Sequence, residues 1–191
     1  MRELGVRKLT AFPLQSSGTY GDAIALKNCV SLSTTNNYTE SEYKSDCTIE
    51  NSISKLESVD VSIEMSSNMA LDLVARLTGQ ESKNGKVATV VGAVVPRFAL
   101  AYEILMDDNT TRRRVLYNCN LRKDEQANET DSEGQTFTFT GKALPVEIDE
   151  KLYVDLMMSE SEIAAMEEGK EEAQAEYAKF FTSVVLPGAV E

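Results

Sequence analysis

The sequence predicts a mainly β fold: a β-sandwich or barrel-like body with one packed internal helix and an acidic C-terminal helix. Three observations support this prediction. Short segments of alternating apolar and polar residues recur along the chain, one internal segment has helical apolar spacing, and a second, glutamate-rich one lies near the end. Many strands with one internal helix are typical of a sheet body that a helix covers on one side.

The first quarter of the chain has the weakest pattern. Residues 1–22 are predicted to be an N-terminal arm ending in a turn, and a strand is predicted over 23–33. Residues 36–55 contain few large aliphatic side chains, so we expect a long exposed loop or hairpin, with short strands near 39–43 and 48–53. Loops of that length inside a domain are uncommon and usually functional or disordered.

The next segment has the clearest strand pattern, with one face buried and the other polar. Its buried positions are Val59, Val61, Ile63 and Met65. A helix is predicted over 67–78, with Gly79 placed to end it. Its apolar face should cover the hairpin that follows.

Residues 94–121 are predicted to be that hairpin, with the turn at 107–110 made of short polar residues that favour a reversal. One apolar face should comprise Phe98, Leu100, Tyr102 and Ile104, then Val115, Tyr117, Cys119 and Leu121. A short β-branched strand is expected before it over 87–95. A threonine-rich strand is expected after it, with Phe137 and Phe139 on one face.

The C-terminal segment is predicted to be a helix over 159–183. Ser159 and Glu162 have the spacing of a capping box, and a narrow apolar stripe ends at Tyr177, Phe180 and Val184. Such a helix either packs on its own domain or docks on a partner. The predicted organisation is therefore an arm over 1–22, a body over 23–158 and a packed helix and tail over 159–191.

Charge and composition exclude several classes of function. The net charge is -12, and residues 147–176 carry eleven acidic residues against two lysines, so clustered cations for binding nucleic acid are absent. The chain has no histidine and no phosphate-loop or nucleophile motif, which argues against an enzyme, a cofactor or a metal site. We expect the run Arg112–Arg114 to be a surface or subunit contact. The three cysteines are expected to be reduced, and no membrane span or secretory signal is predicted.

The hairpin resembles that of the major tail proteins, which build the tail tube of long, non-contractile bacteriophage tails. The strings PRFALAY at 96–102 and RVLYNC at 114–119 carry the likeness. The Tyr43–Ile53 segment, the LTG at 77–79, the threonine-rich strand and the closing Phe180-Phe181 follow in the same order, so it spans roughly 20–187. The predicted acidic helix is longer than we expect for a member of this family.

The resemblance implies a structural subunit of a virion tail, assembled in the host cytoplasm into stacked hexameric rings joined through sheet edges. Its partners would be other copies and tail proteins such as the tape measure and the tail terminator. DNA would pass through the lumen without specific binding. Within the 36–55 loop, the expected contacts between rings are Tyr38, Glu42, Tyr43, Lys44 and Asp46. Asp60 and Glu64 are the expected lumen residues.

Two alternatives remain open at this point. A β-sandwich module that binds carbohydrate or a cell surface would have the same fold, but the chain has no tryptophan to stack on sugars. A tube subunit of a bacterial secretion system would share the architecture and differ in its partners.

Overall fold

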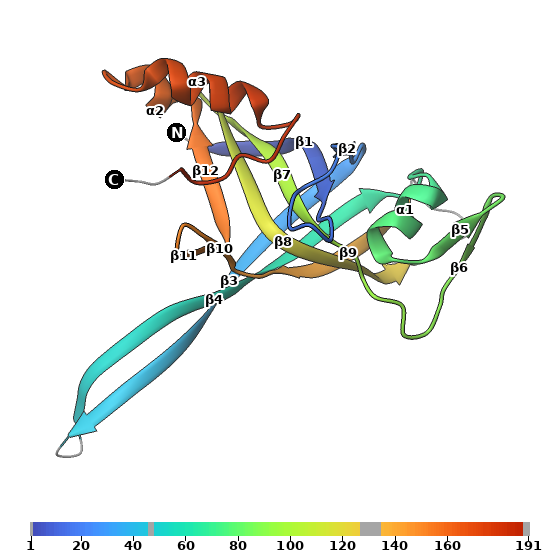
Figure 1. Ribbon diagram of the computed structural model, residues 1–191, viewed down its shortest axis with the longest axis horizontal. Coiled ribbons are helices and arrows are strands. Elements are labelled where there is room, and N and C mark those ends of the chain that lie inside the picture. The colour runs from blue at the N-terminus through green and yellow to red at the C-terminus, as the bar shows by residue number, and fades with distance from the viewer. Residues whose placement is uncertain (1, 46–47, 127–134, 189–191) are drawn as a thin grey trace.

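The computed structural model, which describes residues 2–45, 48–126 and 135–188, confirms the mainly β fold (Figure 1). Eight strands form one twisted sheet in the order β2-β1-β7-β8-β9-β4-β3, and β12 pairs with β8 as a branch. They are β1 (Glu3–Pro13), β2 (Ile24–Ala25), β3 (Cys29–Ser45), β4 (Thr48–Ser66), β7 (Arg97–Met106), β8 (Thr111–Gln126), β9 (Thr136–Ala143) and β12 (Asp155–Ser159). The described chain also contains the hairpins β5 (Glu81–Lys83) with β6 (Lys86–Ala88) and β10 (Val146–Ile148) with β11 (Lys151–Tyr153), and the helices α1 (Leu71–Thr78), α2 (Glu160–Ala165) and α3 (Lys170–Lys179).

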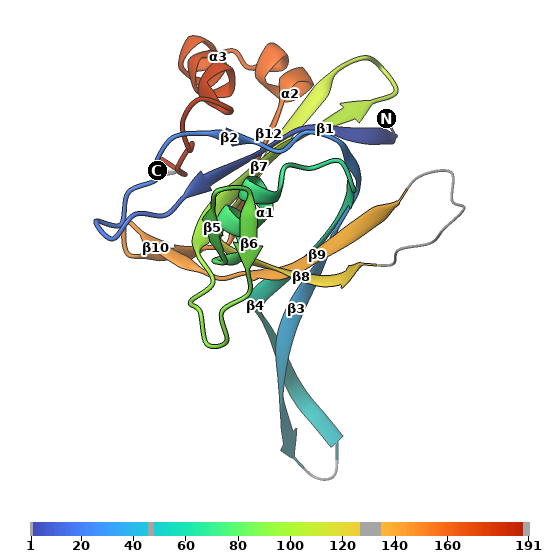
Figure 2. The ribbon, with the colours of Figure 1, turned by 90° about the vertical axis from the view of Figure 1, so that its right-hand side faces the viewer.

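Strand β8 changes partners along its length. Residues 112–116 pair with β12, whereas residues from Cys119 onward pair with β9 on that same side. The far strands of the sheet also approach each other, because β1 contacts β3. The sheet therefore curls into a barrel-like body, with α1 lying across it (Figure 2).

The predicted hairpin is confirmed. Strands β7 and β8 pair antiparallel and are joined at residues 107–110. The Asp108 carboxylate accepts hydrogen bonds from the backbone N–H of Thr110 at 3.0 Å and from its hydroxyl at 2.7 Å. This local bonding explains why short polar side chains reverse the chain here.

The prediction of a single apolar face for this hairpin is wrong. A bulge shifts the register, so that Phe98 pairs with Cys119 but Leu100 pairs with Leu116. Asn118 lies in the bulge with a positive φ of 48°. The bulge reverses the side-chain alternation, and Tyr117 and Cys119 consequently point into different cores.

The two cores lie on opposite faces of β7 and β8. The first contains the predicted apolar positions of β4, together with Phe137 and Phe139 of β9 and Val74 and Leu77 of α1. The predicted lid role of α1 is therefore confirmed. The second core packs Ala99, Val115 and Tyr117 against Phe180 and Val185 of the C-terminal segment. The Tyr117 hydroxyl donates to the Val185 carbonyl at 2.7 Å, which fastens that segment to the sheet.

Helix α1 begins at Leu71, later than the predicted residue 67, and Ala70 is its N-cap. Its predicted end is confirmed, because Gly79 adopts a left-handed φ of 72° and donates to the Ala75 carbonyl. A Cβ on Gly79 would lie 2.5 Å from the Val94 carbonyl oxygen. Glycine is therefore required here for its conformation and for its size.

One segment predicted to be irregular is a strand, and a second segment has longer strands than predicted. The expected arm contains β1, which pairs with β7 and buries Leu9 and Phe12. A bulge at Lys8, with φ of 55°, breaks its alternation and hides the strand in the sequence. Of the two alternatives for residues 36–55, a loop or a hairpin, the hairpin is confirmed: the segment lies within the long β3–β4 hairpin, where backbone pairing rather than apolar burial holds the strands together.

In three other segments, the structure has an interrupted or shortened element where one continuous helix or strand was predicted. The strand expected over 23–33 is interrupted by Asn28, whose φ is 66°, so that β2 and β3 are separate. The strand expected over 87–95 ends with β6 at Ala88, and the rest is a loop. The expected C-terminal helix is two helices, because Met166 is extended and Gly169 is left-handed between them. The predicted capping box is not formed, since the Ser159 hydroxyl bonds the Ser161 hydroxyl at 3.0 Å.

Candidate functional site

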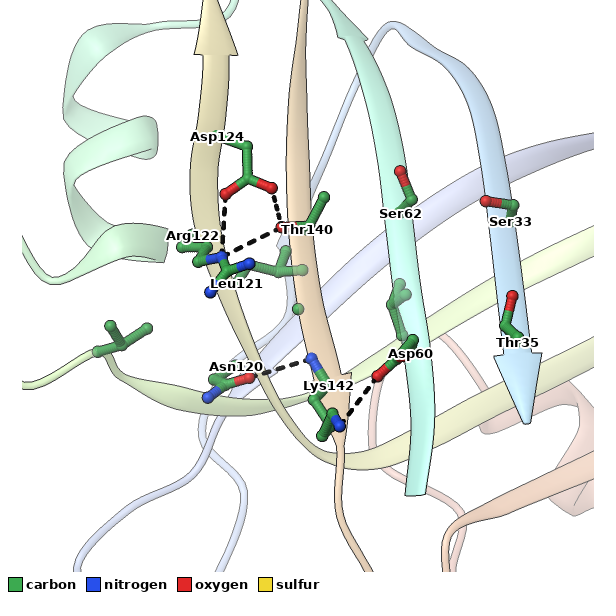
Figure 3. A pocket seen from close by; sticks show the side chains of 13 residues that line it. Ser33, Thr35, Asp60, Ser62, Asn120, Leu121, Arg122, Asp124, Thr140 and Lys142 are labelled. Atoms are coloured by element: carbon green, nitrogen blue, oxygen red, sulfur yellow. Dashed lines mark hydrogen bonds and ion pairs between the residues drawn. The ribbon is translucent and has the colours of Figure 1, made fainter. Parts of the chain in front are cut away.

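One face of the sheet formed by β3, β4, β9 and the second half of β8 is polar and hollowed (Figure 3). This polar face arises because successive side chains of a strand point to opposite sides of the sheet. The apolar side chains of β4 and β9 point into the core, so the polar side chains between them lie on the other side. The hollow has a volume of about 720 Å³. Its polar lining includes Ser33, Thr35, Asp60, Ser62, Asn120, Arg122, Asp124, Thr140 and Lys142.

The predicted lumen residues Asp60 and Glu64 both lie on this polar face of β4. Asp60 forms an ion pair with Lys142 on β9 at 3.3 Å. The hydrogen bond from the Asn37 amide and the Lys142 ammonium hold the pKa of Asp60 below its usual range. Glu64 accepts hydrogen bonds from Ser31 at 3.2 Å and from Thr136 at 2.8 Å. Both carboxylates thus have neighbours from the adjacent strands.

A second polar group on the same face links β8 to β9. Arg122 Nε donates to Asp124 Oδ1 at 2.9 Å and to the Thr140 hydroxyl at 3.3 Å, and Thr140 bonds Asp124 (Figure 3). The bond from Thr140, and then the guanidinium of Arg122, lower the pKa of Asp124. Acidic and basic side chains alternate across the face, so no cluster of one sign forms among its described residues.

Gly141 sets the spacing between β8 and β9 beneath this face. A Cβ at Gly141 would lie 1.8 Å from the Asn120 carbonyl oxygen and 3.0 Å from Leu121 Cδ2. The Asn120 side chain accepts a hydrogen bond from the Lys142 backbone N–H at 3.1 Å. The two strands therefore approach closely enough that only glycine fits.

The other candidate residues lie in an arm, defined as the part of the β3–β4 hairpin between Asn37 and Ser58, which projects from the body (Figure 1). Tyr38 is 55% exposed and lies opposite Leu56, which is 38% exposed. The predicted contact residues Tyr38, Glu42, Tyr43 and Lys44 are all in β3. The remaining candidate, Asp46, lies outside the described residues, as does Cys47. The contact and lumen candidates thus share one strand pair but occupy different parts of it.

A buried ionic cluster was not predicted from the sequence. Glu103 of β7 is completely buried, and its carboxylate contacts Arg7 at 2.5 Å, Lys8 at 3.1 Å and Arg113 at 2.9 Å. Burial by itself raises the pKa of Glu103, but hydrogen bonds from these three cations outweigh it and lower the pKa overall. The signal in the sequence was one acid inside the apolar run FALAYEILM.

The C-terminal helices are attached beside this cluster. The Arg113 guanidinium lies 3.9 Å from the centre of the Tyr177 ring. The Tyr177 hydroxyl is 2.5 Å from the Thr111 hydroxyl, and Glu160 accepts from the Thr111 N–H at 2.9 Å. These contacts fix α2 and α3 against the start of β8.

The prediction of an external contact for the run Arg112–Arg114 is wrong for most of it. Arg113 bonds Glu103, and Arg114 bonds Asp155 on β12 at 2.6 Å, with only 13% of the Arg114 side chain exposed. Arg113 lies opposite Glu103 in the β7–β8 pair. Pairing of β8 with β12 brings Arg114 close to Asp155, and that pairing is not visible in the sequence. These two arginines stabilise the subunit itself.

No group of three or more acidic or cysteine side chains among the described residues is placed to hold a metal ion. Cys29 and Cys119 are free thiols, and Cys119 is buried in the first core. Of the helices in residues 2–45, 48–126 and 135–188, none has the length and apolar character needed to cross a membrane.

Comparison with known proteins gives only distant structural likenesses. No family model matches the sequence, and no curated protein matches it significantly. The chain is similar to Hcp1 from Flavobacterium johnsoniae, with 11% identity and a TM-score of 0.38 over 78% of this chain and 99% of that one. It is also similar to a chain of the sheath-tube complex of an extracellular contractile injection system called PVC in its extended state, with 9% identity and a TM-score of 0.45 over 80% and 88%. A chain of the anti-feeding prophage baseplate gives 12% identity and a TM-score of 0.41 over 83% and 97%. Likenesses of this size establish neither the family nor the function of this chain.

Proposed function

We propose that the protein is the structural subunit of a bacteriophage tail tube, in which stacked hexameric rings form the conduit for genome DNA. The observation that carries the proposal is the arm. Two long strands project from the body, and their exposed apolar side chains, Tyr38 and Leu56, contribute to neither core. A two-stranded ribbon has little stability in isolation, so a projecting one is best explained by a partner that covers it.

The edges of the sheet support the same proposal. Among the described residues, β4 is the only strand that pairs with β3, so the backbone of β3 forms no strand ladder on its other edge. Free strand edges favour association with other chains, and closure of identical copies into a ring removes them. The resemblance of the hairpin sequence to that of the major tail proteins supports the same assembly. The tape measure and tail terminator proteins would then be further partners in the virion tail.

The polar face of β3, β4, β8 and β9 suits the wall of a channel for DNA. Lys142 and Arg122 form ion pairs with Asp60 and Asp124, so the face offers no run of unpaired cations to hold phosphates. In this proposal Asp60 and Glu64 face the lumen. No bond-making chemistry is required of any residue in this role.

Shortening the arm tests the proposed function. Replacing residues 38–57 by the turn dipeptide Asn-Gly removes Tyr38 and Leu56 and joins the paired residues Asn37 and Ser58. The product should be a folded monomer that forms no tubes, because no described residue of the removed segment belongs to either core. Negative-stain microscopy at high protein concentration should show hollow tubes for the wild type only. Leu152→Ser, at an exposed position on β11, is the control and should still form tubes. Tubes formed by the shortened protein would contradict the role of the arm, and a wild type that stays monomeric would contradict the function.

Reversing charge on the polar face tests its place in the channel. The double substitution Asp60→Lys and Glu64→Lys should leave tubes intact but slow DNA release from particles, since the added cations would hold phosphates in every ring. The delay should shrink as salt concentration rises. The control, Glu147→Lys with Asp149→Lys in the β10–β11 hairpin, makes the same change of charge elsewhere. Equal release rates for the wild type and the Asp60/Glu64 variant would place these carboxylates outside the channel.

A further inference from the structure

An exposed apolar loop lies between β6 and β7. Residues 89–96, defined here as the valine loop, have the sequence TVVGAVVP and contain no charged residue. Val91 is 99% exposed and Val94 is 88% exposed, although valine is usually a core residue. Neither the fold nor the proposed channel accounts for their exposure. Clustered exposed apolar side chains of this kind mark a surface that binds another molecule.

The valine loop is held against the body. The Cβ position of Gly79, at the end of α1, lies 2.5 Å from the Val94 carbonyl oxygen and 2.9 Å from Pro96 Cδ. Gly92, with φ of 83°, makes the turn that presents Val91. A loop supported in this way can offer a preformed surface, which lowers the conformational entropy lost on binding.

The arm and the valine loop lie toward opposite ends of the longest axis of the molecule. Figure 1 shows the arm at one end and, at the other, α1 and the β5–β6 hairpin with the valine loop beside them. Two different surfaces at opposite ends can form a head-to-tail contact, which repeats without closing and so builds a stack. The rings of a tube need this kind of contact along the tube axis.

The two ends carry opposite charge. The described residues of the arm, 37–45 and 48–58, include four acidic residues and two lysines. Residues 76–97, which contain the end of α1, the β5–β6 hairpin and the valine loop, include four basic residues and one acid. Opposite potentials of this kind speed association and set the orientation of the partners. The arm of a second copy therefore matches the end that carries the valine loop, both in its exposed apolar side chains and in its charge.

We infer that the valine loop is the docking surface for the arm of a second copy in the adjacent ring. The exposed pair Tyr38 and Leu56 would pack on Val91 and Val94, and Lys83 and Lys86 would face the acidic residues of the arm. The inference rests on the proposed tube function and identifies the partner surface on which its ring contacts depend.

Photo-crosslinking in assembled tubes tests this contact. A benzophenone amino acid at position 38 should, on illumination, form crosslinks to the peptide that contains residues 87–97. Mixing isotope-labelled and unlabelled protein before assembly should show by mass spectrometry that the two peptides come from different copies. Tubes that form but crosslink position 38 elsewhere, or only within one copy, would overturn the inference and leave the tube function intact. Failure of the wild-type protein to form any assembly would overturn both.

Substitutions in the valine loop provide the second test. Val91→Glu with Val94→Glu should keep the monomer folded, because both side chains are exposed, yet raise the concentration needed for tube formation by about tenfold or more. The matched control is Leu152→Glu, an exposed apolar residue on β11 outside both surfaces. Equal polymerisation of all three proteins would overturn the inference. Wild-type binding to phosphatidylcholine vesicles that the double substitution abolishes, without self-association, would also overturn it and assign the loop to a lipid surface.

Discussion

Replacing Glu103 with glutamine is expected to lower the free energy of unfolding by about 3 kcal/mol at pH 7. The carboxylate is buried, with 1% of the side chain exposed, and three cations converge on it. Removing its charge leaves Arg113, only 14% exposed, without its buried counter-charge. Arg7 and Lys8 are about half exposed and can turn to water, which keeps the expected loss near the lower end for buried pairs. Urea denaturation of both proteins measures the difference.

The pH dependence of this stability follows from the lowered pKa of Glu103. A folded-state pKa below the unfolded value, which is about 4.3 for glutamate, means that the unfolded chain takes up the proton first as the pH falls. The stabilisation by the carboxylate is therefore fully present above that unfolded value and is lost as the pH falls through the folded pKa. The difference in free energy of unfolding between the wild type and the Glu103→Gln variant should be constant near neutral pH and should decrease in acid.

The matched control for Glu103 is Glu3→Gln. Glu3 makes the same kind of ion pair, to Arg112 at 4.0 Å, but its side chain is 59% exposed. Water and salt screen such a pair, so the expected loss is within about 0.5 kcal/mol. A Glu103→Gln protein as stable as this control would show that the buried cluster contributes nothing to the fold.

Replacing Gly141 with alanine is expected to lower the free energy of unfolding by about 3 kcal/mol, near the upper end for overpacking. The added methyl would meet the Asn120 carbonyl oxygen at 1.8 Å, and a backbone atom of a neighbouring strand cannot move aside as a side chain can. Relief requires β8 and β9 to separate, which would weaken their pairing at Leu121 and Gly141. Thermal or urea unfolding followed by circular dichroism measures the loss.

Gly5→Ala is the control for Gly141→Ala. Gly5 is also in a strand, and a Cβ there would meet no atom within 4 Å. Alanine at that position should be neutral or slightly stabilising, because it restricts the unfolded chain. Similar stability for the two alanine variants would mean that the close approach of β8 and β9 is not required for folding.

Local patterns predicted much of the fold. The alternation in β4 and β9, the Asp107–Thr110 reversal and the end of α1 at Gly79 each depend on a few neighbouring residues. The prediction was wrong where a bulge moves the following side chains to the other face of a strand, as at Lys8 and Asn118. A single left-handed residue reverses the alternation there, and the neighbouring residue types do not reveal it. For the β3–β4 hairpin, which the sequence analysis gave as one of two alternatives, the length of the strands was underestimated, because pairing with each other rather than an apolar face defines them.

The candidate site was predictable only in outline. Asp60 and Glu64 could be assigned to one polar face of β4 by alternation, and both lie on that face in the structure. Their partners Lys142, Ser31 and Thr136 come from strands whose register the sequence does not reveal. The ionic cluster of Glu103 was missed for the same reason, because Arg7 and Glu103 are 96 residues apart in the chain.

Strand β8 supplies Leu116 and Cys119 to one core and Val115 and Tyr117 to the other. Melting of either core would disturb the same backbone segment and so remove support from the other. The body should consequently lose its structure in a single all-or-none transition, with no long-lived half-folded species from which free strands could join the wrong neighbours.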